Sequence, residues 1–334
     1  MSGEKRKTVK LHFDPSRPVH LGGVGIGVEQ IEPFLRSDTL FSAICTIWPE
    51  LYGEDGELGL KGMLNGFTNN KPPFLVSSGY PFTGNKRYCL PKPFLPVPKS
   101  ESTPEYDDLA LELKKADFIP ADIFSLWIQG QSLEGKGGAI EGGRSDLKNK
   151  IVETAISRNA LDRLSHASEI YYCGAMIFKD DSGFCFMIEF REEKWEKPLE
   201  AVLRLLGERG LGGERHLGYG RFEPEWAEDG PVFSSAEESE PCCSLSLYHP
   251  AESELDGLSD RLVGYELIQR GGWIGSPLAD KGYRRKLCRM FVEGSAFKKP
   301  PVGRLVPVKP EGAKIPHEVY RYGYAFTIPV RIEE

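Results

Sequence analysis

The chain has 334 residues, of which 40% are hydrophobic and 11% aromatic, enough to bury the cores of two packed domains. Its 42 Lys and Arg against 49 Asp and Glu give a net charge of -7, which excludes nucleic-acid binding through an overall positive field and leaves only a local basic site. No stretch approaches the roughly 20 apolar residues of a membrane helix, so we expect a cytoplasmic protein with no membrane partner.

The cysteines and histidines predict no cofactor or metal. The seven cysteines are an odd number and form no CxxC or Cys/His set, and most of them lie in apolar, strand-like runs. We therefore expect buried free thiols rather than disulfides or zinc. The six histidines are dispersed, and Asp180-Asp181 is better explained as a hairpin turn than as a metal site.

The first predicted element is a half-exposed strand at 9–13, where apolar and polar residues alternate. A glycine-rich loop at 22–27 follows. The next element is a helix that starts at Ser37 and keeps its apolar residues on one face up to Trp48. Ser37 is its predicted N-cap, and the free N–H groups from Ser37 to Leu40 either hold a phosphate or form a plain structural cap.

The middle of the chain predicts an insertion at about 84–149. Residues 70–100 are crowded with proline, which suits short edge strands or connectors. The stretch from Gly130 to Gly143 holds six glycines and no periodicity. We expect a mobile loop there, inside the insertion.

A long hairpin is predicted after the insertion. Its strands are expected at 171–178 and 184–190, joined by a turn at 179–183. Pro198 then opens a helix as its first residue. This helix leads into a glycine-rich segment at 210–222, which is followed by a strand.

The glycine-rich segment at 210–222 is the most informative part of the sequence, with four glycines within nine residues. Nucleotide-binding folds place such a loop before a helix, so that the helix N-terminus faces the phosphate. Here the helix comes first, which excludes a Walker loop and argues against a dinucleotide fingerprint. Binding must then use backbone N–H groups, with Arg215, His216 and Arg221 as donors and Tyr219 as a stacking face. The alternative is a structural cap and turn.

The acidic stretch 236–240 is the best candidate linker. Beyond it the predicted elements are strands at 244–248, 286–292 and 322–332 and a helix at 254–266. The order strand, helix, strands, helix, strand is that of a ferredoxin-like unit, and the C-terminal part reads as a looser copy. We therefore predict an α+β fold with two ferredoxin-like (RRM-like) domains at 1–235 and 241–334.

This arrangement resembles the RAMP superfamily of CRISPR proteins, whose ferredoxin-like domains carry a glycine-rich loop between the second helix and the last strand. Within it, the chain resembles the fourth-subunit family of the Csm, or type III-A, effector complex. The motifs that carry this resemblance are Ser37–Ala43, Arg158–Arg163, Gly271–Trp273, Arg284–Lys286, Glu293–Ser295 and Tyr320–Phe326. Each is weak alone, but they occur together in the family order. Relatives often have Thr-Gly where this chain has Leu164-Ser165.

The resemblance implies a non-catalytic subunit that holds the repeat-derived 5′ tag of the guide RNA (crRNA). It also implies that the subunit bridges the large polymerase-like subunit to the RAMP backbone subunit. In the Arg158–Arg163 element the arginines are candidates to clamp phosphates and Asn159 to read a base, with a solvated helix or loop as the alternative. The full set of candidate RNA-binding residues is His20, Gly22, Gly23, Arg36, Ser37, Arg158, Asn159, Arg163, Gly212, Gly213, Arg215, His216, Gly218, Tyr219, Gly220, Arg221, Gly294 and Ser295.

Two other functions stay open. A guide-RNA-processing RAMP endoribonuclease uses a histidine near the first helix as general acid or base, and His20 and His216 are the candidates. Neither has an identifiable Tyr or Lys partner set. A scaffold without RNA contact would fit the acidic charge. The basic run 284–286 is either an exposed strand face or a surface for RNA or a partner.

Overall fold

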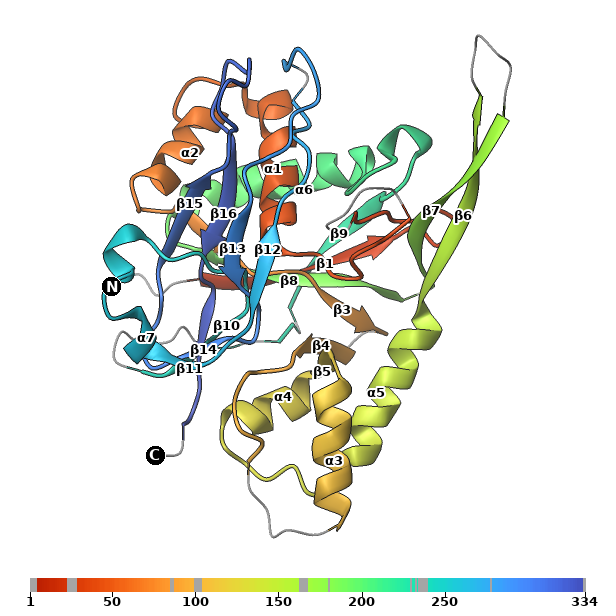
Figure 1. The fold of residues 1–334 in the computed structure, drawn as a ribbon, viewed down its shortest axis with the longest axis vertical. Coiled ribbons are helices and arrows are strands. Elements are labelled where there is room, and N and C mark those ends of the chain that lie inside the picture. The colour runs from red at the N-terminus through yellow and green to blue at the C-terminus, as the bar shows by residue number, and fades with distance from the viewer. Residues whose placement is uncertain are drawn as a thin grey trace.

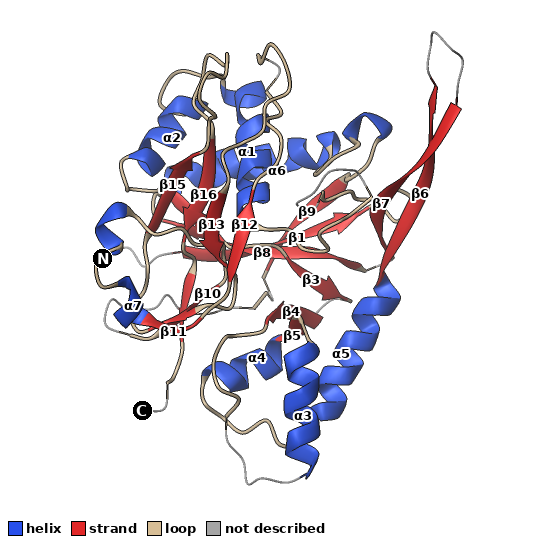
Figure 2. Cartoon of the chain, viewed as in Figure 1, coloured by secondary structure: helices blue, strands red, loops and turns tan. Residues whose placement is uncertain are grey.

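The structure is a computed structural model with a mixed α/β architecture built on antiparallel sheets (Figures 1 and 2). It describes residues 5–22, 29–84, 87–98, 104–161, 168–179, 181–228, 230–231, 233, 240–276 and 278–332. Predictions for Gly23, Arg163, the Asp180 turn and most of the 236–240 linker lie outside these residues. None of the helices in these ranges is long and apolar enough to cross a membrane.

The larger sheet has seven strands in the order β5-β4-β3-β8-β1-β9, and β2 also pairs with β8. Its strands are β1 (Lys5–Phe13), β2 (Phe74–Val76), β3 (Tyr80–Thr83), β4 (Arg87–Pro91), β5 (Phe118–Pro120), β8 (Ser182–Phe190) and β9 (Phe222–Ala227). Helices α1 (Ser37–Tyr52) and α6 (Glu196–Arg209) lie side by side above this sheet, with α2 (Leu60–Thr68) next to α1 (Figure 1). The predicted first strand and first helix are confirmed, and α6 begins two residues before Pro198.

The predicted hairpin of residues 171–190 is wrong, although both of its strands form. The strand β7 (Ser168–Phe178) pairs along its whole length with β6 (Ile151–Leu161), which the sequence analysis missed. The strand β8 is buried at every position and pairs with β1 in the middle of the sheet. Both edges of β8 are occupied, one by β1 and the other by β2 and β3, which leaves no edge for β7. The β6–β7 pair, hereafter the arm, stands out from the body (Figures 1 and 2).

A loop was predicted between Gly130 and Gly143, but the insertion is helical from Gly137 onward. Its helices are α3 (Pro104–Lys115), α4 (Ala121–Ile128) and α5 (Gly137–Lys150). Four of the six glycines lie in the first two turns of α5, a position that their low helix propensity disfavours. Tertiary packing overrides that propensity, because Ile140 is buried and Gly143 packs against Pro120.

The C-terminal part contains a four-stranded antiparallel sheet in the order β11-β14-β10-β17 and two two-stranded sheets, β12-β13 and β15-β16. Its elements are β10 (Cys242–Ser244), α7 (Leu258–Arg261), β11 (Leu262–Gly264), β12 (Leu267–Arg270), β13 (Cys288–Phe291), β14 (Ala296–Phe297), β15 (Gly303–Pro307), β16 (Tyr320–Tyr324) and β17 (Thr327–Pro329). The helix predicted at 254–266 is thus reduced to one turn followed by a strand.

One hydrophobic cluster includes residues from both halves of the chain. Tyr322 of β16 packs its ring 4.8 Å from that of Phe41 in α1, and its hydroxyl accepts a hydrogen bond from the Val76 N–H at 3.0 Å. Tyr324 packs against Phe67 of α2, with the ring centroids 5.7 Å apart. The Tyr320–Phe326 motif, hereafter the tail motif, is therefore part of the N-terminal core.

The seven cysteines are free thiols, five of them buried, as predicted. Burial raises the pKa of Cys242 to about 12, and that of Cys89 rises to about 12 as well, since burial and the nearby Asp122 both disfavour the thiolate. These thiols are packing groups rather than nucleophiles.

Ser37 is not the N-cap of α1. Arg36 occupies the N-cap position, and Ser37 is the first helical residue. The Ser37 hydroxyl accepts a hydrogen bond from the Leu247 N–H at 3.1 Å, while the Ser37 N–H donates to Ser78 Oγ at 2.9 Å. A cap would face solvent, whereas this helix end is covered by the C-terminal part and its polar groups are paired there.

A buried ion network joins the start of α1 to the C-terminal strands. The Asp38 carboxylate accepts hydrogen bonds from Arg270 Nε and Nη2, both at 3.0 Å, and pairs with Arg321 as well. Burial acts to raise the pKa of Asp38, but the charges of Arg270 and Arg321 outweigh it and hold the pKa well below its usual range. Glu32 extends the network by accepting from Arg270 Nη1 at 2.7 Å.

Replacing Asp38 by Asn should destabilise the protein by about 3–5 kcal/mol, because Arg270 and Arg321 would stay buried without a counter-charge. Urea unfolding at neutral pH measures this. Since the pKa of Asp38 is depressed on folding, its contribution is complete above its unfolded value of about 3.9 and is lost as the pH falls through the folded pKa. The difference from the wild type should therefore shrink in acid.

Asp55→Asn is the matched control, since Asp55 forms an exposed ion pair with Lys61. Its cost should stay below about 1 kcal/mol. Equal costs for the two variants would show that the network adds nothing to the stability.

Candidate functional site

The predicted site centres on the loop between α6 and β9, residues 210–221, hereafter the glycine loop. Gly210, Gly212, Gly218 and Gly220 all have positive φ, between 71° and 95°. A short 3-10 turn at Arg215–Leu217 lies between them. Such backbone angles favour glycine, so the loop's shape follows directly from its composition.

The glycines are required by contacts inside the protein. A Cβ on Gly212 would overlap the His20 carbonyl oxygen, and one on Gly220 would overlap that of Leu211. The Gly213 N–H donates to the His20 carbonyl at 2.8 Å, and the Gly220 N–H donates to that of Pro18 at 2.9 Å. Bulky replacements at Gly212 or Gly220 would therefore disrupt the loop itself, whatever their effect on a ligand.

His20 anchors the loop to the base of the arm. It is buried, and its Nδ1 lies 2.7 Å from the carbonyl oxygen of Gly174 in β7. Its neighbour two residues on, Gly22, is exposed and bridges to Ile31. His20 is therefore a structural group at this site rather than an open donor.

The outward side of the glycine loop is basic. Arg215, His216 and Arg221 are exposed, and none of them forms an ion pair or side-chain hydrogen bond with the residues that the structure describes. Glu214 precedes them with a φ of 54°, a rare angle for a residue with a side chain. The cations that the sequence singled out are thus free to bind an external anion.

Tyr219 is not the open stacking face that was predicted. Its side chain is buried, its hydroxyl accepts a hydrogen bond from Arg158 Nη2, and the Arg158 guanidinium lies 5.2 Å from its ring centroid. Burial raises the pKa of Tyr219 against the opposing effect of Arg158. The pair fastens the glycine loop to β6, so Arg158 is occupied internally.

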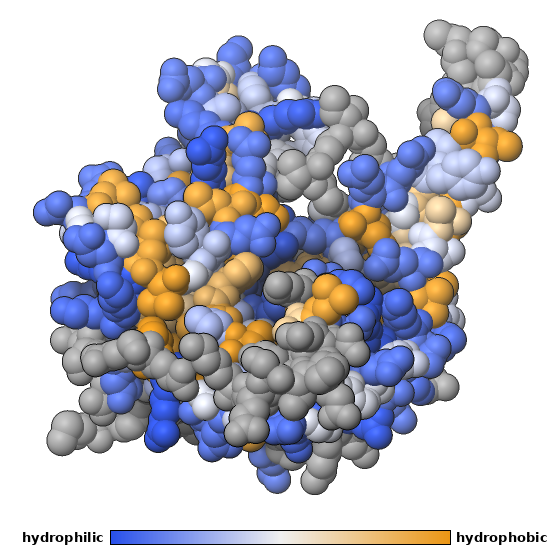
Figure 3. Space-filling model, turned by 60° about the horizontal axis from the view of Figure 1, so that its bottom comes forward, coloured by the Kyte–Doolittle hydropathy of each residue, from blue (hydrophilic) through white to orange (hydrophobic). Residues whose placement is uncertain are grey.

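Asn159 and the outer part of the arm are exposed. Asn159 Oδ1 accepts a hydrogen bond from Ser168 Oγ at 2.6 Å across the two strands. Figure 3 shows hydrophobic surface on the outer part of the arm. The large side chains exposed there are Leu161, Ile170, Tyr171 and Tyr172. The sequence analysis missed this apolar surface because it placed Tyr171 in a hairpin with β8 and expected no strand at 151–161.

Four predicted residues lie in the interior, away from the glycine loop. Arg36 pairs with Glu32 and with the buried Glu293. Ser37 and Ser295 are fully buried. A Cβ on Gly294, which has a φ of 90°, would overlap the Lys92 carbonyl oxygen. These positions hold the two halves of the chain and the insertion together.

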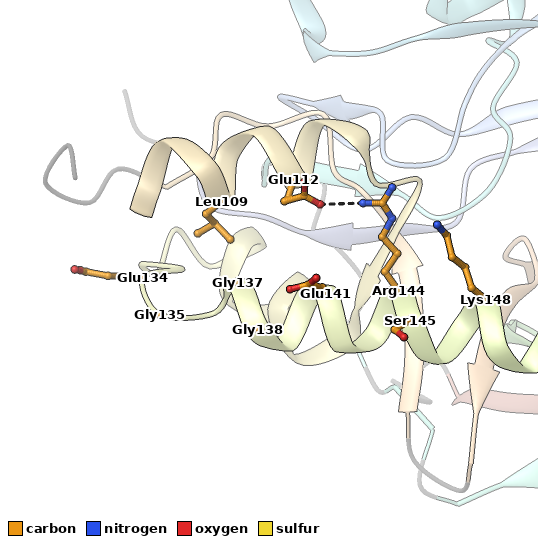
Figure 4. A pocket seen from close by; sticks show the side chains of 10 residues that line it. All are labelled: Leu109, Glu112, Glu134, Gly135, Gly137, Gly138, Glu141, Arg144, Ser145 and Lys148. Atoms are coloured by element: carbon orange, nitrogen blue, oxygen red, sulfur yellow. Dashed lines mark hydrogen bonds and ion pairs between the residues drawn. The ribbon is translucent and has the colours of Figure 1, made fainter. Parts of the chain in front are cut away.

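A cavity of ≈ 840 Å³ lies in the insertion between α3 and α5 (Figure 4). Glu112 and Arg144 form an ion pair of 2.9 Å in its wall, and Glu141 and Lys148 add one charge of each sign. These charges largely cancel, and none of the predicted site residues lines the cavity.

The chain is similar to proteins that all carry the name Csm4. Residues 237–330 match the family described as the CRISPR Csm4 C-terminal domain. The chain is 27% identical to the CRISPR system Cms protein Csm4 of Thermococcus onnurineus over 90% of its length and 92% of that protein. It is 28% identical to the Csm4 of Mycobacterium tuberculosis over 93% of its length and 94% of that protein.

Two solved structures share the fold. The chain in the Csm3-Csm4 subcomplex of the type III-A CRISPR-Cas interference complex matches with a TM-score of 0.63 and 19% identity, over 97% of this chain and 99% of that one. The chain in a Csm1-Csm4 cassette in complex with cA4 matches with a TM-score of 0.62 and 22% identity, over 99% and 100%.

Gly220→Ala should destabilise the protein by at least about 1–2 kcal/mol, because alanine disfavours the left-handed backbone and its Cβ would overlap Leu211. Gly142→Ala, in α5 with open space around it, is the matched control and should stabilise by about 0.5–1 kcal/mol. Thermal unfolding of both variants measures the difference. A harmless Gly220→Ala would contradict the internal role of the loop glycines.

Proposed function

We propose that the chain is a member of the Csm4 family and a non-catalytic, RNA-binding subunit of a type III-A CRISPR ribonucleoprotein, because its C-terminal part matches that family and its full-length relatives carry that name. In this proposal it holds the 5′ tag of the crRNA. The similar structures are a Csm1-Csm4 cassette and a Csm3-Csm4 subcomplex. By analogy, we propose that this chain bridges a large polymerase-like subunit and a RAMP backbone subunit.

The topology supports two ferredoxin-like domains. In the first sheet the strands β9, β1, β8 and β2 are neighbours in that order, with α1 after the first of them in sequence and α6 after the third. In the C-terminal sheet β17, β10, β14 and β11 are neighbours in the same 4-1-3-2 order, with α7 after its first strand and the β15–β16 pair in place of its second helix. This order is that of a ferredoxin-like unit, complete in the first case and degenerate in the second.

The RNA-binding proposal rests on the exposed, unpaired basic side chains of the glycine loop. Arg215, His216 and Arg221 are exposed in a chain whose net charge is -7. The loop that carries them is fixed by its own backbone contacts, so little conformational entropy is lost when a phosphate binds. A local basic site on a rigid loop is what an acidic protein needs to bind RNA.

The surroundings of the two candidate histidines do not favour the endoribonuclease alternative. His20 is buried and bonded to a backbone carbonyl. His216 is exposed, and no side chain of the described residues lies in hydrogen-bond reach of it. Neither arrangement provides a paired general acid and base. A scaffold without RNA contact would leave the loop cations without a role.

Double replacement of Arg215 and Arg221 by alanine should weaken binding to 5′ tag RNA. It should also reduce the slope of log affinity against log salt concentration by about 0.7 per lost phosphate contact, because fewer counterions are released. The control is Lys197→Ala with Arg204→Ala, which removes the same charge from the exposed face of α6. Filter binding over a salt series measures both. Unchanged affinity and slope in the folded double variant would leave the loop as a structural turn.

The second expected outcome is that purified protein with Mg²⁺ or Mn²⁺ leaves repeat RNA and target RNA intact. Gel analysis of end-labelled RNA measures this. The proposal of a non-catalytic subunit would be refuted by specific cleavage that His20→Ala or His216→Ala abolishes in a folded protein.

A further inference from the structure

The segment between β12 and β13, residues 271–287, hereafter the Trp273 loop, has a local charge opposite to that of the whole chain. It holds four Lys and Arg residues against one Asp, a net charge of +3 where the chain carries -7. In Figure 1 it rises at the top of the molecule next to the loop between β15 and β16. Ser276 Oγ lies 2.8 Å from His317 Nε2 in that neighbouring loop. The glycine loop, by contrast, lies between α6 and β9.

Trp273 is the most exposed of the five tryptophans, with 60% of its surface accessible. Trp48, Trp127 and Trp195 are buried, and Trp226 is half-buried. The guanidinium of Arg284 lies 4.9 Å from the Trp273 ring centroid. Burial of an indole from water releases a large hydrophobic free energy. Contact of Trp273 with a ligand would supply this free energy.

The loop holds Trp273 in a fixed position. The Ile274 N–H donates to the Tyr283 carbonyl at 2.8 Å, and the Arg285 N–H donates to the Gly272 carbonyl at 2.9 Å, so the two sides of the loop are cross-linked. Ile274, which follows Trp273, is buried in a small hydrophobic cluster with Val308 and its neighbours. The exposed indole is therefore pre-organised rather than a frayed side chain.

The cations next to Trp273 have no acidic partner. Arg284 forms no ion pair within the described part of the chain, and Lys281 lies over the Tyr283 ring at 5.4 Å. Asp280, the acid of the loop, accepts the Tyr283 hydroxyl at 2.7 Å. Lys286 pairs with Glu311 at 3.1 Å, and the half-buried Arg285 donates a hydrogen bond to Ser42 Oγ at 3.3 Å. A fixed aromatic face beside free cations suits an unpaired base and its phosphates.

We propose that the Trp273 loop is a second contact for single-stranded RNA, separate from the glycine loop. An unpaired base stacks on the indole face of Trp273 that Arg284 leaves free, and Arg284 and Lys281 bind the adjacent phosphates. This inference rests on the proposed function for the nature of the ligand, but not on the glycine loop. The exposed Leu278 and Leu287 would also suit a protein partner, which the test below separates from RNA.

The test uses the full-length protein and a short single-stranded RNA, followed by tryptophan fluorescence and by filter binding. RNA should quench the long-wavelength emission of the exposed Trp273. Trp273→Leu should remove this quenching and weaken binding roughly 5- to 100-fold, the range measured for loss of one base–aromatic stack. Trp273→Phe keeps a ring and should retain most of the affinity. Arg284→Ala with Lys281→Ala should lower the salt slope.

Trp226→Phe is the control for fluorescence, and circular dichroism checks that each variant folds. The glycine-loop variant with Arg215→Ala and Arg221→Ala should still show the quenching at saturating RNA, so failure of one site can be told from failure of the other. If Trp273→Leu binds RNA as the wild type does, the proposal is overturned. It is also overturned if that variant keeps its RNA affinity but no longer co-purifies with its partner subunits.

Discussion

The burial of Asp38 is the constraint on which the rest of the structure depends. This carboxylate, on the first turn of α1, is surrounded by Arg270 and Arg321 from two C-terminal strands. A buried charge tolerates few alternative arrangements, because each lost partner leaves an ion without water. The two halves of the chain are thus fixed in one relative orientation. That orientation places the glycine loop, the arm and the Trp273 loop around a common body.

The same contact explains why motifs far apart in the sequence occur together. Asp38 belongs to the first helix motif, Arg321 to the tail motif and Glu293 to a third, and Arg270 directly precedes the Gly271–Trp273 motif. Glu293 pairs with Arg36, the residue before this helix motif. Burial raises the pKa of Glu293, and the charge of Arg36 acts in the opposite direction. Several of the motifs that carry the resemblance therefore lie on the two sides of one internal interface. Asp38, Glu293 and Arg321 act there by packing and pairing, whereas Trp273 and Arg284, which also lie in these motifs, face the solvent.

Local patterns predicted the elements whose neighbours are local. The helix from Ser37 and the strand β1 follow from their own periodicity, and the glycine loop follows from its composition. The arm could not be predicted from local sequence. Whether β7 pairs with β6 or with β8 depends on which edges of β8 the other strands of the assembled sheet occupy. The helix α5 was missed because its glycines are tolerated only through contacts such as that of Gly143 with Pro120. At the site, Arg215 and Arg221 are exposed, as a binding role requires, but burial of Tyr219 depends on Arg158 from a strand that was not predicted.

The arm has a consequence for how the chain behaves outside an assembly. Among the described residues its outer half is a two-stranded ribbon without a third strand, and it carries Leu161, Ile170 and Tyr172 in contact with water. Isolated ribbons of this kind are marginally stable, and their unpaired edges and apolar side chains favour association with other chains. The protein should therefore become less soluble as the amount of chain with an uncovered arm rises. A cell that makes this chain in excess of whatever covers the arm would accumulate it as an insoluble or degraded product.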